Sequence, residues 1–250
     1  MDFIQLTSCL TSDAAKLAEA ADGKLDAGVP SCPEWTNADL LEHVAMVYNH
    51  KTECMRNGKP ENWPPEKTGD TPPLTQLRHA LGDLLAEFTA RQPSDAAYTW
   101  YDPDQTVGFW IRRMAQETVI HRVDAEQASA VALSPIDADL AVDGIDELLA
   151  IFLGWSSVKW HEHVTDHVTK LLTAPIAVSS GGRSWLVRPT PDGNAEVTEG
   201  AGDGAVATVS GEPADVLLWL WRRAPYDSVT VDGNADAAKG FYELLSEFTG

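Results

Sequence analysis

The stretch Trp110-Ile-Arg-Arg-Met-Ala-Gln-Glu-Thr-Val-Ile-His-Arg-Val-Asp-Ala-Glu126 decides the fold of the N-terminal part of the chain. No glycine or proline interrupts it, and its spacing predicts a helix. One face carries apolar and ionisable residues at steps of four and three: Trp110, Met114, Glu117, His121 and Asp124. The opposite face is apolar as well: Ile111, Ala115, Val119 and Val123. A helix that is apolar on two sides is expected to be buried, so Glu117 and His121 need a partner, and a metal ion is one candidate.

The segments around this helix predict a helical bundle. Helical spacing recurs in four other segments: 3–22, 36–56, 74–91 and 136–173. The last of these is expected to break near Gly154. Thr36 is the expected N-cap of the second helix, and Asp39, three residues later, would complete a capping box. Amphipathic helices joined by loops are typical of a bundle, which we assign to residues 1–170.

The pattern changes near Pro175 to short β-type runs separated by turns rich in glycine. These runs are 176–178, 185–187, 195–198, 205–210 and 228–232. Helices are expected at 213–223 and 236–248. The sequence therefore predicts a two-domain α+β protein, with a small α+β domain over residues 171–250.

Composition limits the classes of function. The 250 residues are 44% hydrophobic and 22% charged, as in an ordinary soluble protein, and the formal net charge is -20. Such a charge argues against a nucleic-acid partner, which needs clustered Lys and Arg. No signal-like start and no membrane-length apolar run is visible, and the three cysteines form no CxxC pair. We expect a cytoplasmic protein with free thiols and no membrane partner. Its oligomeric state stays open between a monomer and a homodimer.

His43 could join Glu117 and His121 at a common site. Residues at i and i+4 lie on the same side of a helix, and a neighbouring helix could add the third ligand. Two His and one Glu form a ligand set known for catalytic zinc. Asp124, one turn after His121, could support a ligand through a hydrogen bond. By spacing alone, a hydrogen-bonded core histidine is the simpler interpretation of His43, and Glu117 with His121 could equally be an ordinary polar pair.

Three strings carry a resemblance to a known family. Ser31-Cys-Pro-Glu-Trp-Thr-Asn-Ala-Asp-Leu-Leu-Glu-His43 resembles the CPGWT-x2-DL-x2-H signature of mycothiol-dependent maleylpyruvate isomerase-like proteins, a branch of the DinB-like helical bundles. Glu117-Thr-Val-Ile-His-Arg-Val-Asp-Ala-Glu126 resembles that family's E-x3-H-RxDAE segment. Val209-Ser-Gly-Glu-Pro-Ala-Asp-Val-Leu-Leu-Trp-Leu-Trp-Arg-Arg223 is similar to its SGPASDLLLWLWGR segment.

The resemblance implies a DinB-like four-helix bundle followed by a sterol-carrier-protein-like α+β domain. It also implies that His43, Glu117 and His121 bind a divalent metal, usually zinc, whose open position takes a low-molecular-weight thiol, mycothiol in actinobacteria. The thiolate would attack a small electrophile, as a maleylpyruvate isomerase-like enzyme or an S-transferase. The family's catalytic arginine falls on Arg223. Arg222 replaces the usual glycine, so the local backbone and the substrate end could differ.

Two other functions stay open at this stage. The scaffold could serve as a non-enzymatic module that binds a metal or a small ligand, or as a metal-dependent hydrolase with a zinc-bound water. A second metal site is a weaker hypothesis, based on the close spacing of three histidines: His161, His163 and His167. Cys32 could be a reactive thiol, although a packed cysteine is the simpler interpretation. No nucleotide-binding or serine-nucleophile motif is visible.

Overall fold

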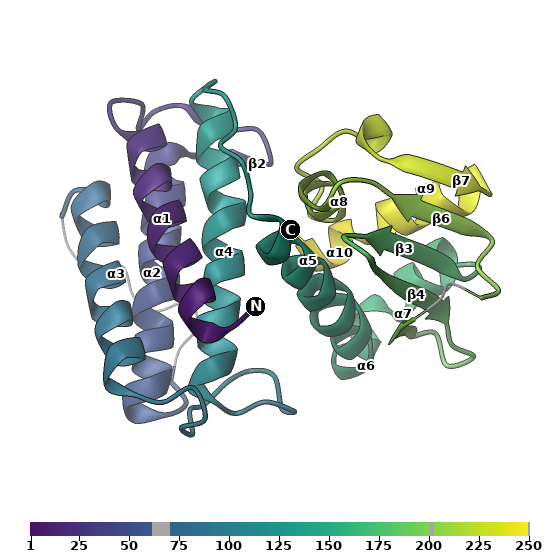
Figure 1. Cartoon of the computed structure of the whole chain (residues 1–250), viewed down its shortest axis with the longest axis horizontal. Coiled ribbons are helices and arrows are strands. Elements are labelled where there is room, and N and C mark those ends of the chain that lie inside the picture. The colour runs from purple at the N-terminus through teal and green to yellow at the C-terminus, as the bar shows by residue number, and fades with distance from the viewer. Residues whose placement is uncertain (62–70, 201–202, 250) are drawn as a thin grey trace. The chain divides into compact units, whose positions relative to one another are not determined.

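The computed structural model describes residues 1–61, 71–200 and 203–249 (Figure 1). The chain divides into two compact units, Met1–Ser134 and Pro135–Gly250. Most of the connection between the second and third predicted helices, residues 57–73, lies outside the described residues. In the part of the chain that the structure describes, no helix is long and apolar enough to cross a membrane.

The first unit is a bundle of four long helices that lie side by side (Figure 1). They are α1 (Phe3–Ala21), α2 (Asn37–Asn57), α3 (Pro73–Ala90) and α4 (Val107–Ala128). Helix α1 packs mainly on α4, α2 packs mainly on α3, and α2 also contacts α4. The predicted helical bundle is confirmed. The residues between α1 and α2 form a small antiparallel pair, β1 (Gly28–Val29) and β2 (Cys32–Thr36).

The start of α2 is fixed as its sequence predicts. The Thr36 hydroxyl accepts a hydrogen bond from the Asp39 backbone N–H at 3.3 Å, and the Asp39 carboxylate accepts one from the Thr36 backbone N–H at 2.9 Å. This reciprocal capping box satisfies two donors that a helix end leaves without partners. His43 follows two turns into the helix, so the cap sets the position from which its side chain projects.

Helix α4 packs on α1 and α2 and is buried along almost its whole length. From Val107 to Glu126 every residue is buried except Arg112 and Glu117, which confirms that both faces of this helix pack against protein. An internal helix of this kind places its ionisable side chains among other helices rather than in water.

The boundary between the units differs from the predicted one at residue 170. The helical segment after Ser134 belongs to the second unit, as α5 (Ala138–Glu147), a π-helix (Leu148–Trp155), α6 (Ser156–Lys159) and α7 (His161–Leu171). Helix α5 packs on α8, the π-helix packs on strand β5, and α7 packs on α9. An amphipathic pattern shows which face is buried but not whether a bundle or a sheet covers it.

The expected break at Gly154 is absent, and the chain instead turns at Trp160, between α6 and α7. A Cβ atom at Gly154 would lie 3.3 Å from the side chain of Val197 and from the Leu149 carbonyl oxygen. This glycine therefore serves close packing of the π-helix on β5 rather than a change of direction.

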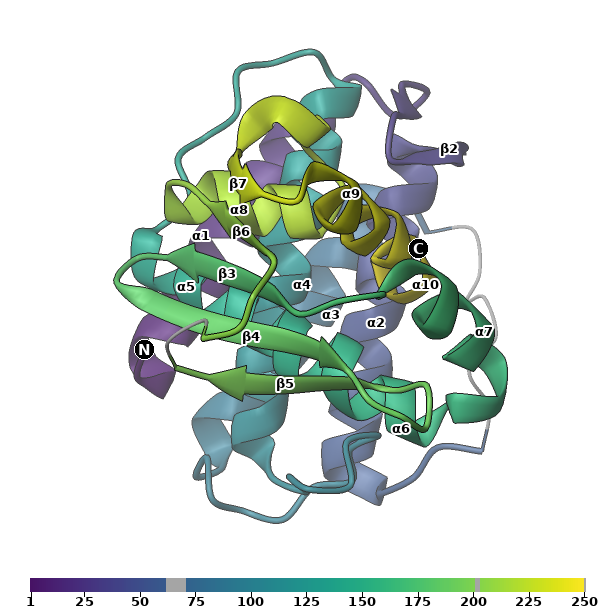
Figure 2. The same cartoon turned by 90° about the vertical axis from the view of Figure 1, so that its right-hand side faces the viewer.

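The second unit is built on a five-stranded mixed sheet, seen in Figure 2. Its strands are β3 (Ile176–Ser180), β4 (Arg183–Pro189), β5 (Ala195–Glu199), β6 (Ala207–Ser210) and β7 (Thr230–Gly233). Their order is β5-β4-β3-β6-β7, with β3 and β6 parallel and the other pairs antiparallel. The helices that complete the unit are α8 (Pro213–Leu220), α9 (Ala235–Leu244) and α10 (Ser246–Thr249). The predicted two-domain α+β class is confirmed.

Arg222 ends α8 in a conformation that favours glycine. Its φ is +58°, and its N–H bonds to the Trp219 carbonyl while the next N–H bonds to the Leu218 carbonyl, which is the Schellman ending of a helix. Its guanidinium lies over the Tyr242 ring at 4.7 Å and donates to the Tyr242 carbonyl at 2.9 Å. The backbone thus keeps the left-handed turn although the residue is not glycine.

This arrangement predicts unequal effects on stability for two substitutions at Arg222. Arg222→Ala loses both contacts with Tyr242 and keeps the backbone strain, whereas Arg222→Gly loses the contacts but relieves the strain. The glycine variant should be more stable than the alanine variant by about 1 kcal/mol, the cost of a left-handed residue that carries a Cβ. Chemical denaturation of both variants measures this difference. An alanine variant as stable as the glycine variant would contradict the strain at this position.

Candidate metal centre

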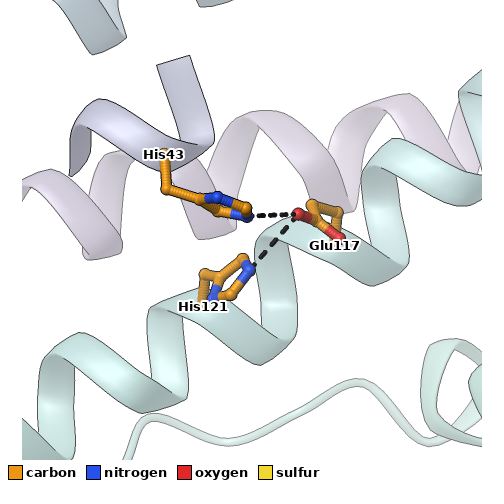
Figure 3. Close-up of side chains that lie close together, drawn as sticks. All are labelled: His43, Glu117 and His121. Atoms are coloured by element: carbon orange, nitrogen blue, oxygen red, sulfur yellow. Dashed lines mark ion pairs between the residues drawn. The ribbon is translucent and has the colours of Figure 1, made fainter. Parts of the chain in front are cut away.

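Three donor side chains converge between α2 and α4 (Figure 3). His43 comes from α2, and Glu117 and His121 come from successive turns of α4. One ligand atom from each residue lies within 4.8 Å of those from the other two. The structure therefore brings together the three side chains that the sequence predicts as metal ligands. Their binding of a metal stays a prediction.

Both imidazoles direct the same nitrogen at one carboxylate oxygen. The Nε2 atom of His43 lies 3.4 Å from Oε1 of Glu117, and Nε2 of His121 lies 3.2 Å from that oxygen. The two rings are 5.1 Å apart between centroids and nearly perpendicular, at 74°. Trp35 lies on strand β2, just before α2, and the centroid of its ring is 4.7 Å from that of the His43 ring. Three donors thus share one small volume, with an aromatic neighbour at its side.

The site is mostly enclosed but not sealed. The exposed fraction is 24% for the side chain of His43, 15% for Glu117 and 11% for His121. Solvent therefore reaches the group from the side of α2. A small molecule needs such access to meet a bound metal.

Electrostatics keep Glu117 charged in this enclosed place. Burial by itself raises the pKa of its carboxyl, but the charge of His121 and hydrogen bonds from both histidines outweigh that effect. Arg113 acts in the same direction, with Nη2 only 2.6 Å from Oε2 of Glu117. Together they hold the pKa of Glu117 well below its usual range. Its Oε1 faces the imidazoles while Arg113 holds Oε2, so the carboxylate has a fixed orientation.

A second carboxylate orients His121. Asp124 is fully buried, and its Oδ2 lies 3.0 Å from Nδ1 of His121, while the Ser31 hydroxyl donates to its Oδ1 at 2.6 Å. Burial lowers the pKa of His121, but Glu117 and Asp124 outweigh it and raise the value to about 9. The carboxylate of Asp124 keeps a proton on Nδ1 of His121. The lone pair of Nε2 is therefore the one that can bind a metal. His121 must lose its second proton before it binds a metal.

The donor set fits a divalent metal. Two imidazole nitrogens and one carboxylate oxygen are ligands of catalytic zinc sites, which keep a fourth position open. Here the three donors converge, the carboxylate is charged, and a hydrogen bond fixes the ring orientation of one histidine. Carboxylate partners of this kind are typical of histidines that bind zinc. His43, Glu117 and His121 are therefore the residues that would hold the ion.

Arg113 and Ser31 contribute to the site without having been predicted. Arg113 lies one turn before Glu117. This i, i+4 spacing is enough to predict an ion pair between the two side chains. Ser31 lies in the first of the family-like strings, but nothing in its local sequence indicates that it reaches Asp124. The role of Ser31 depends on how the segment before α2 meets α4.

The three histidines near α7 do not form a second site. Within the described ranges, only one group of three or more side chains could hold a metal ion, and it consists of His43, Glu117 and His121. His161 pairs through Nδ1 with the Asn194 side chain at 2.8 Å, and His167 lies 3.1 Å from Glu247. No disulfide joins the three cysteines, and Cys32 is half-buried. The predicted reactive role of Cys32 stays untested.

Arg223, predicted to be catalytic, has a defined place within the second unit. It follows the left-handed turn at Arg222, and its Nη1 donates to the carbonyls of Trp221 at 2.9 Å and of Thr249 at 3.1 Å. The side chain is half-buried. Its catalytic role stays a prediction.

Comparison with known proteins identifies the family. Residues 7–126 match the model of the mycothiol maleylpyruvate isomerase N-terminal domain, and residues 139–240 match the model of the C-terminal domain of the same proteins. The chain belongs to this family. The gap between the two matches contains Ser134, where the structure divides into its two units, so the family domains and the compact units agree. None of the curated proteins matches the chain in sequence.

Solved structures show the same fold. The crystal structure of the mycothiol-dependent maleylpyruvate isomerase is 14% identical, with a TM-score of 0.59, and that of a mutant of it is 13% identical, with a TM-score of 0.61. Both matches cover 94% of this chain and 95% of the other. A ubiquinone synthesis protein matches 46% of this chain, with a TM-score of only 0.31. The sterol-carrier-like character of the second unit therefore stays a prediction.

Proposed function

We propose that this chain is a metal-dependent enzyme that uses a low-molecular-weight thiol, mycothiol or one like it, to attack a small electrophile. The observation that carries this proposal is the convergence of two imidazole nitrogens and a carboxylate oxygen within 4.8 Å. Membership of the mycothiol maleylpyruvate isomerase family supports the choice of co-substrate. The donor set favours zinc as the metal.

The side chains of the site have separate tasks in this proposal. A divalent metal, when bound, favours the thiolate form of a thiol at neutral pH and so supplies the nucleophile. Arg113 keeps the carboxylate of Glu117 charged and oriented. Asp124 keeps Nε2 of His121 directed at the site. The partial exposure of His43 leaves a path for the thiol and the electrophile.

The family resemblance implies a catalytic role for Arg223. A guanidinium is always charged and donates several hydrogen bonds in a plane, which suits a substrate that develops negative charge during attack by a thiolate. The same thiolate could add reversibly to an activated double bond, giving cis–trans isomerisation. It could alternatively displace a leaving group, giving S-transfer.

Turnover tests this function. The purified full chain, loaded with zinc and supplied with mycothiol, is expected to isomerise an activated cis double bond or to conjugate an aryl halide. Removal of the metal should slow this reaction at least about 100-fold, since a metal contributes several kcal/mol to such a step. The readouts are product formation and thiol consumption.

Other outcomes of this experiment point to the two other functions. Turnover of an ester or amide that persists in thiol-free buffer would identify a metal-dependent hydrolase. Zinc binding with no turnover of any member of the electrophile panel would identify a binding module. Either result would contradict the proposed thiol chemistry.

A further inference from the structure

The short hairpin of β1 and β2 lies against both helices that carry the candidate metal ligands. Strand β1 contacts α4, and strand β2 contacts α2. Val29, next to the turn, is buried, and at the base of the hairpin the Asn37 N–H donates to the Ala27 carbonyl at 2.9 Å. The hairpin is thus anchored at its turn and at its base. It carries two side chains, Ser31 and Trp35, whose contacts lead to the two histidines of the metal group.

Ser31 acts on His121 through a buried carboxylate. The Ser31 hydroxyl donates to Oδ1 of Asp124 at 2.6 Å, and Oδ2 of the same carboxylate lies 3.0 Å from Nδ1 of His121. Asp124 is completely buried, and hydrogen bonds are stronger in such a place than in water. Because the carboxylate is a rigid plane, a hydroxyl that holds Oδ1 also holds Oδ2. Ser31 therefore helps to fix the direction in which Nε2 of His121 points.

Trp35 acts on His43 by direct contact between rings. Their centroids are 4.7 Å apart, and the two planes are tilted by 44°. The side chain of His43 is the most exposed of the three candidate ligands, so it has room to rotate unless a neighbour restricts it. The half-buried indole of Trp35 restricts that rotation on the side of the hairpin.

These two contacts meet one geometric requirement. The Nε2 atoms of His43 and His121 approach Oε1 of Glu117 from different helices, at 3.4 and 3.2 Å. A group of ligands is useful to a metal only if each keeps its orientation, which packing and hydrogen bonds from neighbouring residues provide. The hairpin provides one such support to each histidine, a hydrogen-bonded carboxylate for one and an aromatic ring for the other.

We propose that the β1–β2 hairpin orients both imidazoles of the metal group, with Ser31 and Trp35 as its positioning residues. This inference rests on the proposed function and deepens it, because it names residues that set the affinity for the metal without binding the metal. One short segment of chain thereby coordinates two ligands that come from different helices. A hairpin with a purely structural role would stabilise the bundle without a selective effect on zinc.

The zinc affinity of hairpin variants tests this inference. Ser31→Ala and Trp35→Ala should each weaken zinc binding by the full chain about 10- to 100-fold, the usual effect of removing a group that supports a metal ligand. Ser31→Thr keeps the hydroxyl and Trp35→Phe keeps an aromatic ring, so both should largely retain the affinity. Competition with a chelator measures the affinity, and urea denaturation of the metal-free proteins records their stability. Wild-type affinity in either folded alanine variant would overturn the proposal.

Matched controls change the same residue types elsewhere. Ser12→Ala, at an exposed position on α1, and Trp160→Ala, at a residue that is 50% exposed, should bind zinc as wild type does. Loss of zinc affinity in these controls as large as in the hairpin variants would contradict a selective role of the hairpin. If Trp35→Ala does not fold, Trp35→Leu takes its place, since it keeps an apolar side chain without the aromatic ring.

A double variant tests whether Ser31 acts through Asp124. In an Asp124→Ala protein, Ser31→Ala should have little further effect on zinc affinity, because the hydroxyl has lost the group that it holds. The full loss of affinity in both backgrounds would overturn the proposed action of Ser31. If the Asp124→Ala protein does not fold, the contrast between Ser31→Ala and Ser31→Thr still decides the matter.

NMR spectra of the imidazoles in metal-free protein separate this inference from the proposed function. Ser31→Ala should speed the exchange with water of the His121 Nδ1 proton, and Trp35→Ala should shift the ring protons of His43. If the wild-type chain binds no zinc, the proposed function fails, and these spectra still decide whether the hairpin orients the two rings. If turnover depends on zinc but affinity and spectra are unchanged in all hairpin variants, the hairpin proposal fails and the proposed function stands.

Discussion

His121→Ala is expected to remove bound zinc from this protein. The imidazole supplies one of three converging donors, and its Nε2 lies 3.2 Å from the carboxylate oxygen of Glu117. Structural zinc sites with four ligands bind with an apparent free energy of about 10–16 kcal/mol, so one ligand accounts for roughly 3 kcal/mol. The affinity for zinc should therefore fall on the order of 100-fold or more. Competition with a chelator, followed by elemental analysis, measures this loss.

Two further variants test whether zinc is lost because a ligand is removed or because the protein is destabilised. Loss of the ring at residue 121 also leaves the buried carboxylate of Asp124 with one partner fewer, so the variant could be destabilised. His43→Ala removes a more exposed ligand, at 24% exposure of its side chain, and should lose zinc with less effect on stability. His79→Ala removes an exposed histidine on α3 and should bind zinc as wild type does. Equal zinc affinity in all three variants would contradict the site.

Asp13→Ala is expected to destabilise the bundle by about 3 kcal/mol, the cost of breaking a buried ion pair by removing one partner. Arg122 on α4 is completely buried, and its Nε lies 3.2 Å from Oδ1 of Asp13 on α1. The guanidinium also contacts Glu126 at 3.0 Å and the Ser134 carbonyl at 2.8 Å. Removing Asp13 takes away the carboxylate that joins the two helices and leaves the guanidinium poorly compensated.

A nearby pair supplies the control for this prediction. Lys16 also contacts Asp13, at 3.6 Å, but 37% of its side chain is exposed. Ion pairs at the surface contribute little, so Lys16→Met should change stability by less than about 1 kcal/mol. Both variants are compared by urea denaturation of the metal-free protein. A loss in Asp13→Ala no larger than that in Lys16→Met would show that the Arg122 network does not hold α1 to α4.

Local sequence rules predicted the elements well where short-range interactions determine them. The capping box at Thr36 and Asp39 depends on residues three apart, and the burial of α4 follows from its two apolar faces. The pairing of β3 with β6 depends on residues about thirty positions apart, and no local pattern reveals it. The structure divides the chain at Ser134 rather than at residue 170 for a related reason, because the amphipathic segment after Ser134 packs on elements of the second unit.

The candidate site was predictable only in part. Spacing grouped Glu117 with His121 and allowed His43 as a third ligand, and the resemblance of three strings to a family then favoured all three as ligands. The supports of these ligands are Ser31, which lies in the segment before α2, and Arg113, which lies one turn before Glu117. Only the spacing of Arg113 is visible in the sequence. The contact of Ser31 with Asp124 joins residues far apart in the chain, so no local pattern reveals it.

X-ray absorption at the zinc edge, recorded before and after addition of mycothiol, tests the central claim most directly. The account predicts scattering from two imidazoles and oxygen ligands at about 2.0–2.2 Å in the zinc-loaded protein, and a new sulfur at about 2.3 Å once the thiol is added. Zinc without histidine scattering would contradict the assignment of His43 and His121. Zinc with two histidines that gains no sulfur would contradict the use of a thiol at this site.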